Sequence, residues 1–184
     1  SCWDTDSLNF LLEYEPPVLK LASASITDKN LLEAYVQTKL PIIMSTGMST
    51  MEEIKKAHKI LNTNPLAILH TTSTYPCPPE ELNLNMIKTL IKEFPNNPIG
   101  YSGHESGLST SIAAAVLGAK IIERHITIDR ALWGTDQSAS LGIEGMNKLV
   151  GSINKITVSL GDGVKKVYES ENPIKEKLRN KNTI

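Results

Sequence analysis

Short apolar runs recur along this chain at intervals of about one strand plus one helix, and each run ends in polar residues. Taking Lys20, Ser45, Thr72, Ser102 and His125 as equivalent strand ends gives spacings of 25, 27, 30 and 23 residues. Five such units in series predict a parallel α/β protein. A doubly wound sheet is the alternative to a barrel, although the sequence contains neither a G-x-G-x-x-G nor a G-x-x-x-x-G-K-[ST] nucleotide signature.

The apolar runs predict five strands, at residues 18–22, 41–44, 66–70, 98–101 and 121–126. The amphipathic segments between and after them predict helices, at residues 29–35, 51–61, 83–94, 108–117 and 144–160. Asp28 is expected to begin the first of these helices. Ser49 or Thr50 is expected to cap the second, and Ser49 has the capping-box spacing to Glu52. Polar residues bunched where apolar strands end favour a barrel with its chemistry on the carboxyl-terminal face.

Composition describes a globular chain: of 184 residues, 40% are hydrophobic and 21% charged, with a net charge of -1. This balance gives no electrostatic basis for binding nucleic acid. No apolar run approaches the roughly 20 residues of a membrane span, and no signal peptide is recognisable, so a cytoplasmic location is expected. Cys2 and Cys77 have no metal-finger spacing and are interpreted as ordinary thiols.

Seven segments, in this order, carry a resemblance to a known family: SCWD at 1–4, LKLAS at 19–23, PIIMSTGMST at 41–50, LHTTSTYP at 69–76, GYSGH at 100–104, IERH at 122–125 and GTDQSASL at 134–141. Together they resemble the sialic acid synthases, which have a NeuB-like (β/α)8 barrel. The resemblance implies condensation of phosphoenolpyruvate with an N-acetylmannosamine-type sugar and release of phosphate. It also implies a divalent metal, with manganese preferred over magnesium or cobalt, and a homodimer.

The resemblance further implies that the barrel is incomplete at both ends. Residues 1–170 are expected to form a partial TIM barrel of about five carboxyl-terminal βα units. Residues 171–184 resemble a linker towards a missing antifreeze-like domain. Family members carry a glutamate and a phosphate-binding lysine on the first two strands, which this sequence lacks, so the isolated chain is expected to be inactive.

His104 and His125 stand at the ends of successive predicted strands, where two imidazoles can share a metal ion. Glu123 lies two residues before His125 and therefore faces the same side, whereas Arg124 faces the other side and is assigned to structure. Glu123 is a catalytic candidate, because an acid there can orient the imidazole or transfer a proton. A structural salt bridge is the alternative role of Glu123.

Phosphoenolpyruvate needs cations and hydroxyl donors. Lys20 lies within an apolar strand, where a lysine is costly unless an anion pairs with it. A lysine that merely reaches solvent from an edge strand is the alternative. Ser23, Ser45 and Ser102 follow strands and can bind anion oxygens, although such residues are often helix caps. The resemblance adds Ser73, where neuraminate-forming relatives carry asparagine.

For the sugar, the resemblance points to Tyr75 and Asp136. Tyr75 offers a ring and a hydroxyl, and Asp136 can bind sugar hydroxyls or transfer a proton, which makes it the second catalytic candidate. The alternative role of Tyr75 is to shape a turn before Pro76, and the alternative role of Asp136 is to form an Asx turn. Gln137 replaces a histidine of many relatives, which leaves the acceptor sugar open. Trp3, Met44 and Met48 are interpreted as packing residues.

Three functions are therefore compatible with the sequence. The first is a nonulosonic (sialic) acid synthase, active as part of a longer enzyme. The second is a related phosphoenolpyruvate-dependent aldol synthase or a spore-coat polysaccharide version of the same barrel. The third is a barrel fragment without catalytic activity.

Overall fold

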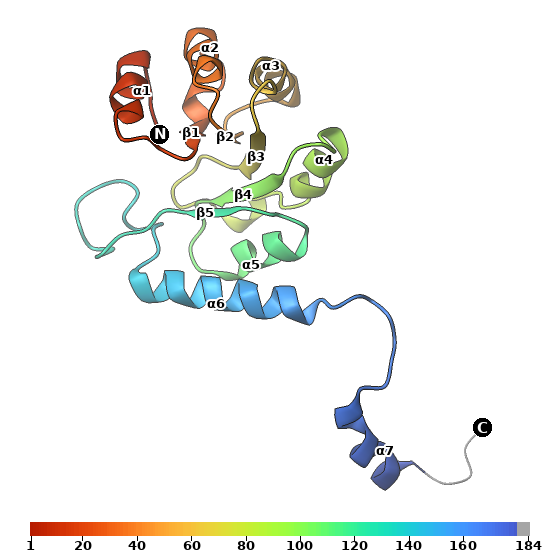
Figure 1. Ribbon diagram of the computed structural model, residues 1–184. Coiled ribbons are helices and arrows are strands. Elements are labelled where there is room, and N and C mark those ends of the chain that lie inside the picture. The colour runs from red at the N-terminus through yellow and green to blue at the C-terminus, as the bar shows by residue number, and fades with distance from the viewer. Residues whose placement is uncertain (180–184) are drawn as a thin grey trace.

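The computed structural model describes residues 1–179, and its centre is a sheet of five parallel strands (Figure 1). The strands are β1 (Leu19–Leu21), β2 (Ile42–Ser45), β3 (Leu66–Thr71), β4 (Ile99–Gly103) and β5 (Ile122–Arg124). Each strand pairs with the next one in the sequence, so the order is β1-β2-β3-β4-β5. A doubly wound sheet reverses its order at a switch point. The observed order therefore confirms the prediction of a partial barrel.

Helices connect successive strands and lie outside the sheet, as Figure 1 shows. The α-helices are α1 (Thr5–Leu12), α2 (Lys29–Gln37), α3 (Met51–Leu61), α4 (Met86–Glu93), α5 (Ser109–Val116), α6 (Ile143–Ser159) and α7 (Asn172–Leu178). Short 3-10 turns occur at Ser23–Ser25, Pro79–Glu81 and Glu169–Glu171. Neither α1 nor α7 was predicted from the sequence.

The two faces of the sheet differ because side chains alternate along each strand. Leu19, Leu21 and Met44 are fully buried in the core beneath the helices. Lys20, between the two leucines, points to the opposite face, where it lines a cavity with Ser45. That opposite face is the inner, concave side of the partial barrel, and it carries the polar residues at the strand ends.

The predicted strands are correct in number and order, but their ends differ: β1 and β5 are shorter than predicted, whereas β2, β3 and β4 extend one or two residues further at their carboxyl ends. Strand β5 was predicted to reach residue 126. Arg124 is its last residue paired with β4, opposite Gly103. Beyond that point the chain leaves the sheet, and Ile126 forms an isolated bridge with Leu141.

Side-chain caps begin three of the helices: Asp4 caps α1, Asp28 caps α2 and Thr50 caps α3. The Leu31 N–H donates to Asp28 Oδ1 at 3.1 Å, which confirms the predicted start of α2. Thr50 caps α3, and Glu53 Oε2 accepts from the Thr50 N–H at 2.7 Å to complete a capping box. The capping-box pairing of Ser49 with Glu52 is therefore wrong by one residue, because the Ser49 hydroxyl donates to Gly47 O instead.

We expect Thr50→Ala to lower the free energy of unfolding by about 1 kcal/mol, because it leaves an N–H group of the first turn of α3 unpaired. The measurement is urea unfolding followed by circular dichroism. Ser49→Ala is the matched control and should change stability by less than about 0.5 kcal/mol. Equal losses in the two variants would show that the hydroxyl of Thr50 has no special role.

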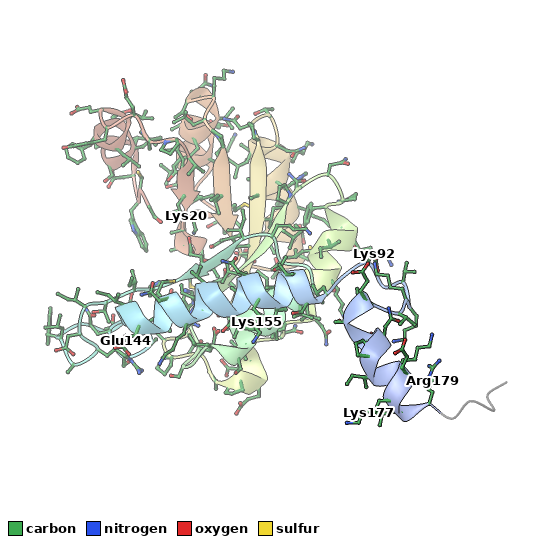
Figure 2. The ribbon with its side chains drawn as sticks, turned by 60° about the horizontal axis from the view of Figure 1, so that its bottom comes forward. Lys20, Lys92, Glu144, Lys155, Lys177 and Arg179 are labelled. Carbon is green, nitrogen blue, oxygen red and sulfur yellow. The ribbon has the colours of Figure 1, made fainter. Side chains whose placement is uncertain are left out.

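The last part of the described chain is largely exposed. Leu149 is the one buried residue of α6 within the described chain. Figure 2 shows Glu144 and Lys155 along α6, Lys177 on the separate α7, and Arg179 just after the end of α7. The role of 171–184 as a linker stays a prediction, and residues 180–184 of it lie outside the described part. Among the helices of residues 1–179, none has the length and apolar character to cross a membrane.

Candidate functional site

The ten residues predicted to form the site all line one cavity, at the carboxyl ends of the strands, with a volume of about 370 Å³. They are Lys20, Ser23, Ser45, Ser73, Tyr75, Ser102, His104, Glu123, His125 and Asp136. The structure thus brings together residues that are spread over most of the chain. Their individual roles stay predictions, whereas their common location is observed.

Two residues interpreted as packing also line this cavity. Trp3 is 64% exposed and Met48 is 70% exposed, so neither is a core residue and that interpretation is wrong for both. Met44 is fully buried, as expected. A single large apolar residue among polar neighbours, as in SCWD and STGMST, carries no periodic pattern that would show whether it lies in a core or on a cavity rim. Thr71, at the end of β3, is a further lining residue; it was counted among the polar residues at strand ends but was not predicted as a site residue.

The rings of His104 and His125 meet edge to face, with their centroids 5.1 Å apart. His104 Nδ1 lies 2.7 Å from the Thr72 carbonyl oxygen. Because a carbonyl only accepts, Nδ1 carries the proton of the neutral ring, and the lone pair is on Nε2. Burial is the main cause that lowers the pKa of His104, and nearby His125 lowers it further. His104 is therefore held as a neutral imidazole, the form that binds metals.

This donor set fits a divalent metal that takes two imidazoles from the chain. Residues 1–179 contain no group of three or more histidine, cysteine, aspartate or glutamate side chains placed to hold a metal ion. A site with two protein ligands leaves other positions for water or substrate oxygens, which suits catalysis better than structure. The carbonyl that orients His104 is the kind of outer contact that fixes a metal-binding tautomer.

Lys20, Ser102 and Glu123 form a polar group on the inner face. Lys20 Nζ lies 3.6 Å from Glu123 Oε1, and the Ser102 hydroxyl donates to the same oxygen at 2.7 Å. Burial lowers the pKa of Lys20, and the charge of Glu123 partly opposes that effect. The Lys20 side chain is 21% exposed and reaches this group rather than open solvent. An anion bound beside it would stabilise the ammonium.

Hydroxyl groups crowd the neighbouring part of the cavity. The Gly47 N–H donates to Ser23 Oγ at 2.9 Å. Ser45 Oγ and Ser73 Oγ are buried and have no hydrogen-bond partner among the described residues. Since buried polar groups are normally paired, these two hydroxyls are placed to bind a ligand or water. A Cβ at Gly47 would collide with the Ser73 hydroxyl and lie 2.9 Å from Ser23 Oγ, so a larger residue there would displace these hydroxyl groups.

Tyr75 and Asp136 lie beside the histidines. The ring centroid of Tyr75 is 4.2 Å from that of His104, and the Tyr75–Pro76 peptide bond is cis. Burial raises the pKa of Tyr75, with a further contribution from the charge of Asp136. Asp136 Oδ2 lies 3.4 Å from His125 Nδ1. The backbone carbonyl of Asp136 accepts from the Ser140 N–H, and Asp136 Oδ1 accepts from the Thr135 hydroxyl at 2.9 Å, so Oδ2 is the carboxylate oxygen that faces His125.

The prediction that Glu123 and Arg124 face opposite sides is confirmed. Arg124 points away from the cavity and pairs with Glu105 at 3.1 Å, where both side chains are buried. Glu105 was not predicted as a structural or site residue from the sequence. A glutamate in a glycine-rich and serine-rich segment gives no sign that it will be buried, because its partner comes from a different strand.

A second buried histidine, outside the cavity, gives a pH prediction. Burial lowers the pKa of His70, whose Nε2 donates to Leu82 O at 2.7 Å. The unfolded chain therefore binds this proton at a higher pH than the folded chain does. Neutral His70 therefore contributes its full stabilisation at pH values above the pKa of the unfolded chain, about 6.5. This contribution decreases as the pH falls from there towards the lower pKa of the folded chain.

We expect the free energy of unfolding to decrease by on the order of 1 kcal/mol between about pH 7.5 and pH 5.5. His70→Gln keeps a donor for Leu82 O but does not titrate, so it should show a smaller decrease. The measurement is urea unfolding of both proteins at each pH. Identical pH dependence in the two would exclude His70 as a source of the effect.

Known proteins with similar sequences indicate the family to which the residues of this cavity belong. N-acetylneuraminate-9-phosphate synthase of Homo sapiens is 39% identical over an alignment of 178 positions, which covers 95% of this chain and 49% of that protein. N,N'-diacetyllegionaminic acid synthase of Legionella pneumophila is 36% identical over an alignment of 189 positions, which covers 99% of this chain and 53% of that protein. The chain thus spans about half the length of these relatives.

Solved structures with a similar fold include members of the same group of enzymes. The crystal structure of N-acetylneuraminic acid (sialic acid) synthetase from Leptospira borgpetersenii superposes with a TM-score of 0.85 at 36% identity, covering 95% of this chain and 62% of that chain. A truncated 3-deoxy-D-arabino-heptulosonate 7-phosphate synthase from Thermotoga maritima, at 20% identity and a TM-score of 0.73, shares the fold alone. Residues 1–165 match the NeuB family, and they include every residue of the cavity. The chain therefore belongs to the NeuB family.

Proposed function

We propose that this chain forms the site-bearing part of a nonulosonic (sialic) acid synthase. The reaction is the condensation of phosphoenolpyruvate with N-acetylmannosamine or a related acetamido sugar, with release of phosphate. The observation that carries the proposal is the convergence of two imidazoles, one lysine and several hydroxyl groups on one cavity. The names of the human and Legionella relatives support it, and they differ in the sugar acid formed, so the acceptor stays open.

A divalent metal, preferably manganese, would be held by His104 and His125 and would act as a Lewis acid on the sugar aldehyde. Lys20 balances the negative charge of phosphoenolpyruvate, because it is the lysine that lines the cavity within residues 1–179. The unpartnered hydroxyls of Ser45 and Ser73 donate to phosphate or carboxylate oxygens. These contacts hold the enol methylene group of phosphoenolpyruvate against the aldehyde carbon.

Two carboxylates remain for proton transfer. Glu123 can accept the proton of the water that adds to the former enol carbon, and Lys20 and Ser102 orient that carboxylate. Asp136 is 3.4 Å from His125 and can bind the sugar or protonate the new alkoxide. Tyr75, against the ring of His104, offers an apolar surface and a hydroxyl to the sugar.

The structure contains five of the eight βα units of a closed TIM barrel. The condensation is therefore proposed for a protein in which the barrel is closed, and the chain of 184 residues is predicted to be inactive alone. The expected cytoplasmic location and homodimer belong to the same proposal. Sedimentation of the closed-barrel protein tests the dimer.

The test uses a chimera in which residues 1–165 replace the matching segment of the Leptospira synthetase. Phosphate release from phosphoenolpyruvate is measured with Mn²⁺ and a series of acceptors: N-acetylmannosamine, its 6-phosphate, a 2,4-diacetamido hexose, and aldose phosphates without an acetamido group. Release with an acetamido sugar supports the proposal. Release with aldose phosphates alone would favour the related aldol synthase. A folded chimera inactive with every acceptor would favour a non-catalytic barrel.

A further inference from the structure

A buried ion pair lies on the helix side of the sheet, behind the cavity. Its two residues are the sequence neighbours of the two histidines. Glu105 follows His104, and Arg124 precedes His125. Glu105 is 2% exposed and Arg124 is 7% exposed, and their side chains meet at 3.1 Å. Because side chains alternate along an extended chain, the ion pair faces the helices while the two imidazoles face the cavity.

The carboxylate of Glu105 is held on all sides. Its oxygens accept hydrogen bonds from Tyr101, Thr110, Ser111 and Arg124, at distances between 2.7 and 3.1 Å. These donors come from β4, α5 and β5. Burial opposes ionisation of Glu105, but the hydrogen bonds from Ser111 and Thr110 and the charge of Arg124 outweigh it, so the pKa of Glu105 is lowered. The group is therefore a charged and fully bonded anchor point.

Arg124 holds the backbone as well as the side chain of residue 105. Its Nη2 donates to the carbonyl oxygen of Glu105 at 2.5 Å, and its Nη1 donates to Gly107 O at 2.8 Å. One planar guanidinium thus bonds the side chain of Glu105, the carbonyl oxygen of Glu105 and the carbonyl oxygen of Gly107. A lysine cannot reproduce this arrangement, because its donors come from a single nitrogen.

The hydrogen bonds of Arg124 and Glu105 connect the two chain segments just beyond the end of the β4–β5 ladder. The pair Gly103 and Arg124 is the last one in the β4–β5 ladder. His104 and His125 both lie just beyond it, so strand pairing does not fix the distance between their backbones. Among the contacts of the described residues, the pair of Glu105 and Arg124 is the direct side-chain link between these two chain segments on the helix side.

Stability alone does not explain why a charged pair is buried here. Taking two charges out of water is costly, and replacing a buried ion pair by apolar residues of similar size is often neutral or stabilising. What apolar residues cannot supply is a directional link with fixed geometry. Metal ligands need that geometry, since supporting contacts typically change metal affinity by about 10- to 100-fold.

We propose that Glu105 and Arg124 are positioning residues that set the spacing and orientation of His104 and His125 for a shared divalent metal. This inference rests on the proposed function, in which the two histidines bind that metal. Neither Glu105 nor Arg124 touches the metal or the substrates. Their effect passes through the backbone of the residues next to them.

The test measures Co²⁺ binding by the 184-residue chain with calorimetry, since imidazole binds Co²⁺ more tightly than Mn²⁺. The main variant is Glu105→Met with Arg124→Leu, which keeps the volume and removes the directional bonds. We expect it to retain the unfolding temperature within a few degrees and to bind Co²⁺ about 10- to 100-fold more weakly. Arg124→Lys keeps the charge and should weaken binding by about 3- to 10-fold.

Leu90→Ala is the control for general destabilisation, because Leu90 is a buried core residue of α4. It should lower the unfolding temperature and leave Co²⁺ affinity unchanged. Unchanged affinity in the folded double variant would overturn the proposal, and Arg124→Lys decides the question if the double variant does not fold. Failure of the unaltered chain to bind Co²⁺ would instead overturn the shared metal site, and with it the role of the ion pair.

Discussion

Replacing His104 by alanine is expected to lower phosphoenolpyruvate-dependent phosphate release by at least about 1000-fold in the closed-barrel chimera. In the proposed function this change removes one of the two imidazoles that would hold the metal, and a Lewis acid contributes several kcal/mol to stabilising the transition state. His125→Ala should have a similar effect. The double variant should be little worse than either single one, because the two ligands act as a unit.

The same variants should lose Co²⁺ binding in calorimetry, which separates loss of the metal from loss of chemistry. His58→Gln is the matched histidine control, because His58 lies against Phe94 and Asn97 on the helix side and outside the cavity. It should retain activity and metal affinity. Full activity of His104→Ala would contradict the metal role, whatever the family of the chain.

Gly100→Ala is expected to lower the free energy of unfolding by about 3 kcal/mol or more. A Cβ at Gly100 would lie 2.6 Å from Ile121 O and would also collide with the side chain of Leu69. Ile121 O accepts the hydrogen bond from the Tyr101 N–H at 2.8 Å, so the methyl group can be accommodated only by separating β4 from β5. Thermal unfolding should show a decrease of about 10 °C.

Gly151→Ala is the control with the opposite sign. Gly151 lies within α6, and a Cβ there would meet nothing within 4 Å among the described residues. Alanine in an exposed helix interior should therefore raise the free energy of unfolding by about 0.5–1 kcal/mol. A large loss of stability at residue 151, or none at residue 100, would show that the space around these glycines does not control the outcome.

Periodicity made most of the fold predictable. The spacing of polar strand ends predicted five parallel units, and the observed strand order confirmed the barrel over the doubly wound sheet. Alternation within the strands correctly separated Glu123 from Arg124, and Asp28 correctly began α2. Helices α1 and α7 were missed. The bounds of α3 were predicted correctly, but its cap was left open between Ser49 and Thr50, because both are good capping residues and their three-dimensional setting selects between them.

The sequence by itself determined which residues stand at strand ends, and therefore which could share one face of a barrel. This information is local, since it follows from the two-residue repeat of a strand and the length of a βα unit. Partner choice is not local. Only the tertiary structure paired Glu105 with Arg124, left Ser45 and Ser73 without partners within residues 1–179, and placed Trp3 on the cavity rim. Each of these outcomes depends on packing between distant segments, which determines the depth of burial and the groups within reach of a hydrogen bond.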